Sequence, residues 1–380
     1  MKKNQLVTLG KHIDILSGCA FPSSGFNRNN GVPLIRIRDI LSGKNETYYE
    51  GSYDLKYLIK KGDLLVGMDG DFNREYWKGT DALLNQRVCK ITPNPETLDK
   101  NFLYHFLQKE LDKIHATTDV VTVKHLSVKK IQDIKIRLPS LKEQKRIAAI
   151  LDKADAIRQK REQAIKLADD FLRAKFLEMF GTPANNIHRF PKGTIRDLVD
   201  SVNYGTSAKA SIDSGEYPIL RMGNITYQGR WDFTDLKYLD LSVKEKDKYL
   251  VKEGDLLFNR TNSKELVGKT AVYEEDRPMA FAGYLIRVRP NSIGNNYYIS
   301  GYLNSIHGKI TLMNMCKSIV GMANINAQEL QNIEILIPPK HLQDEYEIIY
   351  KKIKKGLSIY DKSAMQLQLL ASNLSNKYFM

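Results

Sequence analysis

The stretch RLPSLKEQKRIAAILDKADAIRQKREQAIKLADDF occupies residues 137–171, close to the middle of a 380-residue chain. A strand-like run ends at Pro139, and a long, highly charged helical pattern begins directly after it. This pattern ends at FGTP, where Gly181 and Pro183 are typical helix-stop residues. About forty helical residues span roughly 60 Å. Because an isolated helix of this kind is marginally stable in water, the stretch predicts a partner that covers its apolar side.

A second copy of this junction lies near the end of the chain, where LIPPKHLQDEYEIIYKKIKK occupies residues 336–355. Apolar residues after Pro339 recur at spacings of three and four, which is the pattern of a coiled-coil seam. We therefore expect an antiparallel helix pair; the alternative is that each helix packs on its own globular domain. The residues expected in the seam are Ile147, Ile150, Ala154, Ile157, Leu172, Ile349, Ile353, Leu357, Tyr360, Leu367 and Leu374.

Blocks of sequence recur in the same order in the two halves of the chain. The matching pairs are GVPLIRIRDI with EYPILRMGNI (31–40 and 216–225), KKGDLLVG with KEGDLLFN (60–67 and 252–259), and HLSVKKIQDIKIRLPSLKEQ with NINAQELQNIEILIPPKHLQ (125–144 and 324–343). Conserved order with small drifts in spacing is typical of a diverged duplication. The sequence therefore predicts globular domains at 1–140 and 186–340, each followed by a spacer helix, at 141–185 and 341–380.

Within each half, short alternating runs predict strands, and a few amphipathic stretches predict helices. Residues 99–114 form one such stretch, with Asp99 as its expected N-cap, and residues 295–313 occupy the same place in the second half. The predicted fold is α+β: two similar globular domains of strands and short helices, joined by two long helices in an antiparallel coiled coil with pseudo-two-fold symmetry.

The charge of the chain indicates a polyanionic partner. There are 58 Lys and Arg residues against 44 Asp and Glu, which gives a net charge of +14. Nucleic acid is the commonest partner of so basic a protein, although a basic enzyme has the same balance. No apolar run approaches eighteen residues, and the three cysteines are sparse, so we expect a cytoplasmic protein without a membrane span.

The segment IRLPSLKEQKRIAAILDKADAIRQKREQAI and its echo ILIPPKHLQDEYEII resemble the repeated spacer regions of type I restriction–modification specificity subunits. The blocks YPILRMGNI, GDLLFNRTNSKELVGKTAVY and DLLVGMDGDFN resemble the target-recognition domains of that family. The resemblance covers almost the whole chain, and the Pro-x-x-x-Glu-Gln junction at 139–144 is its most specific motif. The second junction departs from this motif, with Leu342 in place of the glutamate.

The resemblance implies a non-catalytic DNA-recognition subunit. Each globular domain would read one half of a bipartite site in double-stranded DNA. The helical pair would fix the spacing and hold two methyltransferase subunits, to which restriction–translocase subunits attach. Two units related by a pseudo-dyad also suit two half-sites on physical grounds, because one duplex turn spans ~34 Å.

Polar loop residues that follow strands are the candidates for DNA contact, because Arg, Asn, Gln and Asp can bind base edges and Lys can bind phosphates. In the first half they are Arg36, Arg38, Asp39, Met68, Asp69, Asp71, Asn73, Arg74, Gln86, Arg87 and Lys124. In the second half they are Tyr204, Thr206, Lys209, Arg221, Asn224, Arg260, Thr261, Asn262, Ser263, Lys264 and Lys269.

No catalytic residue, cofactor or metal site is predicted. SKELVGKT at 263–270 ends like a phosphate-binding loop, but Ser263 stands where that loop needs its first glycine. The cysteines and histidines show no metal-ligand spacing. Two other hypotheses stay open at this point: a DNA-modifying methyltransferase or nuclease with a related recognition module, and a coiled-coil assembly protein whose charge only aids solubility.

Overall fold

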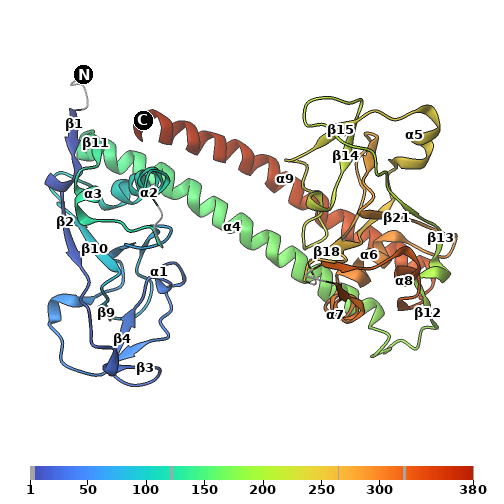
Figure 1. Cartoon of the computed structure of the whole chain (residues 1–380), viewed down its shortest axis with the longest axis horizontal. Helices are drawn as coiled ribbons and strands as arrows, with labels where there is room; N and C mark the ends of the chain where they lie inside the picture. The colour runs from blue at the N-terminus through green and yellow to red at the C-terminus, as the bar shows by residue number, and fades with distance from the viewer. Residues whose placement is uncertain (1–4, 120–122, 264, 320–321, 380) are drawn as a thin grey trace. The chain divides into compact units, whose positions relative to one another are not determined.

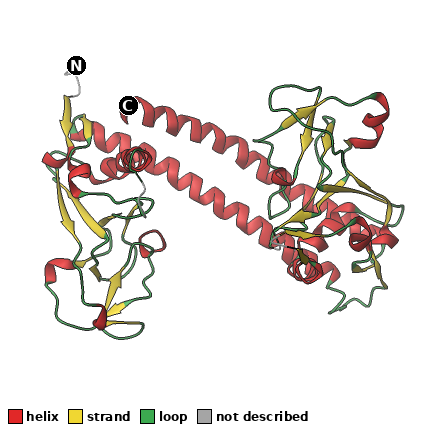
Figure 2. Cartoon of the chain, viewed as in Figure 1, coloured by secondary structure: helices red, strands yellow, loops and turns green. Residues whose placement is uncertain are grey.

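The computed structural model of the chain describes residues 5–119, 123–263, 265–319 and 322–379. Contacts divide the chain into two units. Unit 1 comprises residues 1–160 and 362–380, and unit 2 comprises residues 161–361. Each unit contains small sheets, short helices and a part of each of two long helices, α4 and α9 (Figure 1, Figure 2).

Unit 1 is built around a four-stranded antiparallel sheet. Its strand order is β2 (Ile13–Ser17), β10 (Val88–Pro93), β7 (Leu64–Gly67) and β8 (Arg74–Tyr76). A five-stranded sheet has the order β3 (Phe26–Asn27), β5 (Tyr48–Tyr49), β4 (Val32–Ile35), β9 (Ala82–Leu84) and β6 (Leu58–Ile59), and a further pair joins β1 (Gln5–Thr8) to β11 (Lys135–Leu138). The α-helices besides α4 and α9 are α1 (Asp39–Ser42), α2 (Lys100–Ala116) and α3 (Val128–Gln132).

Unit 2 repeats this plan. Its central sheet has the order β13 (Val199–Tyr204), β21 (Leu285–Pro290), β17 (Leu256–Asn259) and β19 (Thr270–Val272). The other sheets are β15 (Lys237–Leu239), β14 (Tyr217–Leu220), β20 (Met279–Phe281) and β16 (Leu250–Val251); β12 (Lys192–Thr194) with β24 (Glu334–Leu336); and β18 (Thr261–Asn262), β23 (Met322–Asn324) and β22 (Lys317–Ile319). The helices are α5 (Val243–Tyr249), α6 (Asn296–Asn304), α7 (Ile306–Met315) and α8 (Ala327–Gln331).

The two units share their strand connections, which confirms the predicted duplication and the α+β fold. The order β2-β10-β7-β8 of unit 1 matches β13-β21-β17-β19 of unit 2, and β1-β11 matches β12-β24. In both units a parallel pair lies inside an otherwise antiparallel sheet, β4 with β9 and β14 with β20. Matching connections in two halves of one chain follow directly from the repeated sequence blocks.

The two long helices are uninterrupted in Figure 1, where α4 (Leu141–Phe180) is green and α9 (Lys340–Phe379) is red. The predicted helix stop of α4 is confirmed. Gly181 has a φ of +67°, and its backbone N–H donates to Leu177 O at 2.9 Å. Glycine adopts this left-handed conformation without the steric penalty of a side chain, so it ends the helix at low cost.

A buried glutamine in each unit fixes the start of its long helix. The Gln144 side-chain amide donates to Thr97 O at 3.0 Å and Pro139 O at 2.9 Å, and its oxygen accepts from Asp99 N at 2.8 Å. Gln343 donates in the same way, to Ile293 O at 2.9 Å and Pro338 O at 2.8 Å.

The replacement of the junction glutamate by Leu342 in the second copy has a simple physical explanation. Glu143, the residue at the matching position, has a partly exposed side chain that forms a local ion pair with Arg146. The glutamine is the buried member of the junction motif, and both copies keep it.

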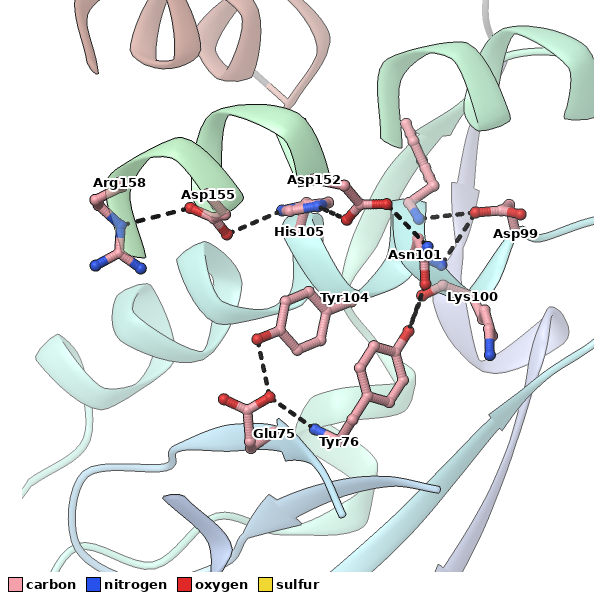
Figure 3. A network of polar contacts seen from close by, with 11 residues as sticks. Glu75, Tyr76, Asp99, Lys100, Asn101, Tyr104, His105, Asp152, Asp155 and Arg158 are labelled. Carbon is pink, nitrogen blue, oxygen red and sulfur yellow. Dashed lines mark hydrogen bonds and ion pairs between the residues drawn. The ribbon is translucent and has the colours of Figure 1, made fainter. Parts of the chain in front are cut away.

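Polar contacts hold α2 against α4 in unit 1 (Figure 3). Asp99 caps α2 by accepting from the backbone N–H groups of Asn101 and Phe102, both at 3.0 Å. Asn101 donates to Asp152 of α4 at 2.9 Å, and His105 Nε2 lies 2.7 Å from the other carboxylate oxygen of Asp152. The predicted helix at 99–114 is confirmed, and its cap and polar face position the globular part of unit 1 on α4.

In unit 2 aromatic packing joins α4, α6 and α9. The Phe176 ring lies 5.3 Å from Tyr346 and 5.6 Å from Tyr298, and Phe180 lies 5.9 Å from Tyr346. Gly301 makes this approach possible, because a Cβ there would lie 2.6 Å from the Phe176 ring. Earlier residues of α4 face later residues of α9: Leu172 lines the same cavity as Leu357. The segments therefore run antiparallel, as predicted.

The residues expected in the seam have different surroundings. Leu172, Leu357 and Ile147 are all buried. Ile147 belongs to the hydrophobic core of unit 1, together with Phe102 and Phe379. Both long helices thus pack on the globular parts as well as on each other. The half-buried members are Ile150, Ala154, Ile157, Ile349, Ile353, Leu367 and Leu374. The side chain of Tyr360 lies outside the described part of the structure.

Candidate nucleic-acid interface

Three segments that are distant in sequence meet at one end of the central sheet of unit 1. They follow β7, precede β10 and precede α3. The backbone N–H of Met68 donates to Arg87 O at 2.9 Å, and Leu126 N donates to Met68 O at 2.7 Å. Gly70 N also donates to Lys124 O at 3.1 Å. We call residues 68–70, 85–87 and 123–125 the sheet-end site of unit 1.

Charged side chains cross this site. The Asp69 carboxylate lies 2.7 Å from His125 Nδ1 and 3.1 Å from an Arg87 guanidinium nitrogen. The side chains of Arg87 and His125 are 55% and 57% exposed, but that of Asp69 is only 22% exposed. Asp69 therefore orients two exposed donors, and its own oxygens are occupied by them.

Unit 2 has a matching site at residues 260–262, 282–284 and 323–325, which we call the sheet-end site of unit 2. Arg260 N donates to Tyr284 O at 3.1 Å, and Ile325 N donates to Arg260 O at 2.9 Å. These bonds repeat the two that Met68 makes in unit 1. The side chains of Thr261 and Asn324 are joined by a hydrogen bond of 3.1 Å, where unit 1 has the pair of Asp69 and His125.

The side chain of Arg260 is oriented by an aromatic ring. Its guanidinium carbon lies 4.9 Å from the centre of the Tyr204 ring, a cation–π distance. The Tyr204 hydroxyl accepts from Ala327 N at 2.9 Å, which fixes the ring in place. The same backbone frame therefore presents an arginine on an aromatic ring in unit 2 and an Asp69-centred cluster in unit 1.

A second group of predicted residues lies after β4 in unit 1 and after β14 in unit 2. Arg36 and Arg38 are exposed and line a concave surface together with Arg28. In unit 2, Arg221 has an ion pair of 2.8 Å with Asp235. Arg38 lies 3.7 Å from Asp39 and 3.9 Å from Glu46, so carboxylates accompany the arginines in both units.

Two predicted readers are buried in turns. Asp39 is 3% exposed and its carboxylate accepts from Arg36 N at 2.9 Å, and burial raises the pKa of that carboxyl. Asn224 is also 3% exposed, and its side-chain oxygen accepts from Arg221 N at 2.8 Å. Both hold the turn after a strand, because a polar side chain satisfies a buried backbone donor there. Both side chains are therefore engaged within their own turn.

Three further predicted residues are buried for other reasons. Met68 belongs to the hydrophobic core of unit 1, and Thr206 accepts from Ala208 N with its hydroxyl. The Lys269 ammonium donates to Met222 O at 2.8 Å, and burial lowers its pKa. None of these side chains is available to DNA in this structure.

The remaining predicted residues are spread over the two units. Arg74 is half-buried, with its guanidinium carbon 3.4 Å from the centre of the Tyr104 ring, and the Lys124 ammonium donates to His115 O at 2.7 Å. The exposed ones are Asp71, Gln86 and Lys209, and the half-buried ones are Asn73, Thr261, Asn262 and Ser263. Lys264 lies outside the described residues.

Sequence reasoning missed three residues of the sheet-end sites: His125, Asn324 and Tyr284. The repeat itself held the signal for two of them, since HLSVKK and NINAQE are matching blocks that begin with His125 and Asn324. Tyr284 is 55% exposed and lacks such a signal. Among the described residues, no group of three or more His, Cys, Asp or Glu side chains is arranged to hold a metal ion.

The fold and its repeated site define a duplicated two-domain α+β protein with long connecting helices. The chain matches the family described as "Type I restriction modification DNA specificity domain" over residues 1–167 and again over residues 190–371. Because these matches cover most of the chain, it belongs to this family. Within the described ranges, no helix is long and apolar enough to span a membrane.

Named relatives agree with the family. The type I restriction enzyme EcoBI specificity subunit of Escherichia coli is 29% identical over 401 residues, covering 97% of this chain and 82% of that protein. The EcoKI specificity subunit of Escherichia coli strain K12 is 23% identical over 377 residues, covering 92% of this chain and 80% of that protein. The crystal structure of an S subunit from M. genitalium has the same fold, with a TM-score of 0.67 at 15% identity and coverage of 100% of this chain and 97% of that one.

Proposed function

We propose that the chain is the DNA-recognition subunit of a type I restriction–modification complex. Each globular domain, at 1–140 and 186–340, reads one half of a bipartite asymmetric site. The observation that carries the proposal is the repeated sheet-end site, with one backbone frame and different side chains in the two units. A common frame with different donors and acceptors suits two half-sites of different sequence.

The chemistry of each site supports base contact. Arg87 and Arg260 carry guanidinium groups that are held by a carboxylate and by an aromatic ring, respectively. An oriented guanidinium can bind guanine O6 and N7 with two hydrogen bonds, at little entropic cost. The amide of Asn324 suits adenine, and the exposed Arg36, Arg38 and Lys209 suit phosphates.

The long helices serve as spacer and docking element in this proposal. The spacer segments at 141–185 and 341–380, which contain α4 and α9, set the number of base pairs between the half-sites. Their charged outer faces hold two methyltransferase subunits, and restriction subunits bind through those. The chain itself contributes recognition and no catalysis, which is supported by the name "specificity subunit" of its relatives.

The test is a DNA-binding titration on a site obtained by mapping methylated adenines in the host genome. Arg260→Ala is expected to weaken specific binding by ~1–3 kcal/mol, because one bidentate base contact is lost. Fluorescence anisotropy at several salt concentrations gives the affinity and the number of phosphate contacts.

The matched control is Arg196→Ala. Arg196 is an exposed arginine of unit 2 in the short helix before β13, at the opposite end of that strand from Tyr204. The Arg196→Ala variant should bind the mapped DNA site with the affinity of the wild type. Equal affinities of the Arg260→Ala variant and the wild type for the mapped site would refute the role of Arg260. Methyl transfer by the isolated chain would refute the non-catalytic part of the proposal.

A further inference from the structure

Unit 2 has a helix break that unit 1 lacks. In unit 1, α2 runs without interruption from Lys100 to Ala116. In unit 2 the corresponding stretch is split into α6 and α7 at Ser305, whose hydroxyl donates to Tyr302 O at 2.6 Å and accepts from Gly308 N at 3.0 Å. A Cβ on Gly308 would lie 2.1 Å from Tyr302 O, so the turn requires glycine. The predicted single element at 295–313 is thus two helices.

The redirected α7 presents an apolar face to solvent. Ile306, Ile310 and Met313 are 67%, 48% and 40% exposed. Their spacing of four and three places them on one side of the helix. With Tyr227 and Val267 they line a groove of about 360 Å³. Exposed apolar side chains gathered along a groove are typical of a site for a protein partner.

The groove also contains the ammonium group of Lys309. Lys309 Nζ donates a long hydrogen bond of 3.4 Å to Gly268 O and lies 5.0 Å from the centre of the Tyr227 ring. Among the described residues, the charges that shift the pKa of Lys309 belong to the cations Arg173 and Lys269. A partly desolvated charge beside other cations is costly, so this site favours an incoming anion.

The charged neighbours of Lys309 increase this preference. Burial, together with the charges of Arg173 on α4 and of Lys269, lowers the pKa of Lys309 to about 8. Arg173 also forms an ion pair with Asp170 at 3.7 Å. Glu265 lines the groove as well and has contacts of its own. The neighbouring charges that lower the pKa of Lys309 are therefore both cationic.

We propose that this groove binds a segment of the methyltransferase subunit. A carboxylate of that segment pairs with the Lys309 ammonium, and apolar side chains on either side of it pack on Ile306, Ile310 and Met313. This inference rests on the proposed function, since it takes the methyltransferase as partner. A protein carboxylate fits better than a DNA phosphate, because protein–DNA interfaces are polar and wet while this groove has an apolar rim.

The two units differ at this position. Lys113 and Lys309 both lie fourteen residues after the N-cap of their helix, Asp99 and Asn295. Lys113 has an ion pair of 2.6 Å with Glu110 and a side chain that is 59% exposed. The partly desolvated ammonium and the apolar groove are therefore features of unit 2, and Lys113 provides a matched control.

The proposal is tested by isothermal titration of the full chain with its methyltransferase subunit. Lys309→Met keeps the shape of the side chain and removes the charge, so the fold should be retained. It is expected to weaken methyltransferase binding roughly 10- to 100-fold, the effect of one hydrogen-bonded charge pair. Lys309→Arg should restore most of the affinity, and Lys113→Met should bind as the wild type does.

A second readout separates binding from a structural role. The folded pKa of Lys309 is about 8 and the ordinary lysine value is 10.5, so the unfolded state binds more protons between these pH values. The stability of unit 2 should therefore rise from pH 8 to 10.5. Lys309→Met should reduce this rise, because the Lys309 contribution is lost while that of Lys269 remains, and it should raise the melting temperature at pH 7. A partner carboxylate raises the pKa of Lys309, so binding at pH 9 should take up protons, as measured in buffers of different ionisation heat.

The outcomes are distinct. Equal methyltransferase affinity for the wild type and Lys309→Met would overturn the groove proposal and leave the proposed function intact. A loss of DNA affinity by Lys309→Met without methyltransferase would also overturn it, in favour of a phosphate contact. Failure of the wild-type chain to bind methyltransferase at all would overturn the partner in the proposed function as well.

Discussion

The buried glutamines at the two helix junctions give a quantitative prediction. Gln144→Leu is expected to lower the free energy of unfolding of unit 1 by about 3–5 kcal/mol, and Gln343→Leu that of unit 2 by about 2–3 kcal/mol. Leucine has a similar volume, so packing changes little. What changes is hydrogen bonding: three bonds are lost at Gln144 and two at Gln343, and each buried group left without a partner costs ~1–3 kcal/mol.

The chain carries its own reporters for this experiment. Of its two tryptophans, Trp77 lies in unit 1 and Trp231 in unit 2. A Trp231→Phe background therefore reports unfolding of unit 1 by fluorescence in urea, and a Trp77→Phe background reports unit 2. Each glutamine variant is compared with its parent in the same background, because the units need not unfold together.

The control replaces Glu143, the partly exposed neighbour of Gln144. Glu143→Leu copies the residue found at the second junction and should change stability by less than about 0.5 kcal/mol, since an exposed ion pair contributes little. The reasoning is wrong if Gln144→Leu costs less than about 1 kcal/mol, or if Gln343→Leu costs more than Gln144→Leu. A loss seen only by the tryptophan of the other unit would also contradict it.

Two further substitutions test the aromatic packing in unit 2 with the same fluorescence assay. Phe176→Ala should cost about 3–5 kcal/mol, because a fully buried ring is removed, whereas Phe171→Ala on the same helix should change little, since Phe171 is 50% exposed. Gly301→Ala should cost about 1–3 kcal/mol, because the new methyl group would lie 2.6 Å from Phe176 and 2.9 Å from Tyr346. A wild-type stability for either Phe176→Ala or Gly301→Ala would refute the packing described above.

Features that depend on local chemistry could be predicted from the sequence. The long central helix was bounded by Pro139 and Gly181, and the observed helix runs from Leu141 to Phe180. Asp99 caps α2 as expected. The duplication followed from block order alone, because matching sequences form matching strands. These signals lie within a few residues of the structure that they specify.

The candidate site could be predicted only in part. The loops after β7 and β17, which the sequence predicts as DNA-contacting, lie at the ends of the two central sheets. The exposure of each side chain was not predictable, since it depends on partners far along the chain. Lys269 is held by Met222 O, 47 residues away, and Asp69 by His125, 56 residues away.

The sequence by itself determined the repeated plan of this protein, its two long helices and its family resemblance, because these rest on periodicity, caps and repeated blocks. Only the tertiary structure decided which of the neighbouring or matching residues are buried and which side chains they contact. Gln144 and Gln343 anchor the junctions, while Glu143 is partly exposed and pairs with Arg146. Arg260 takes the position that buried Met68 has in unit 1. The charges that shift the pKa of Lys309 are those of two cations, whereas Lys113 pairs with Glu110. Burial and pairing are set by contacts between distant residues, so they differ between two halves that share one fold.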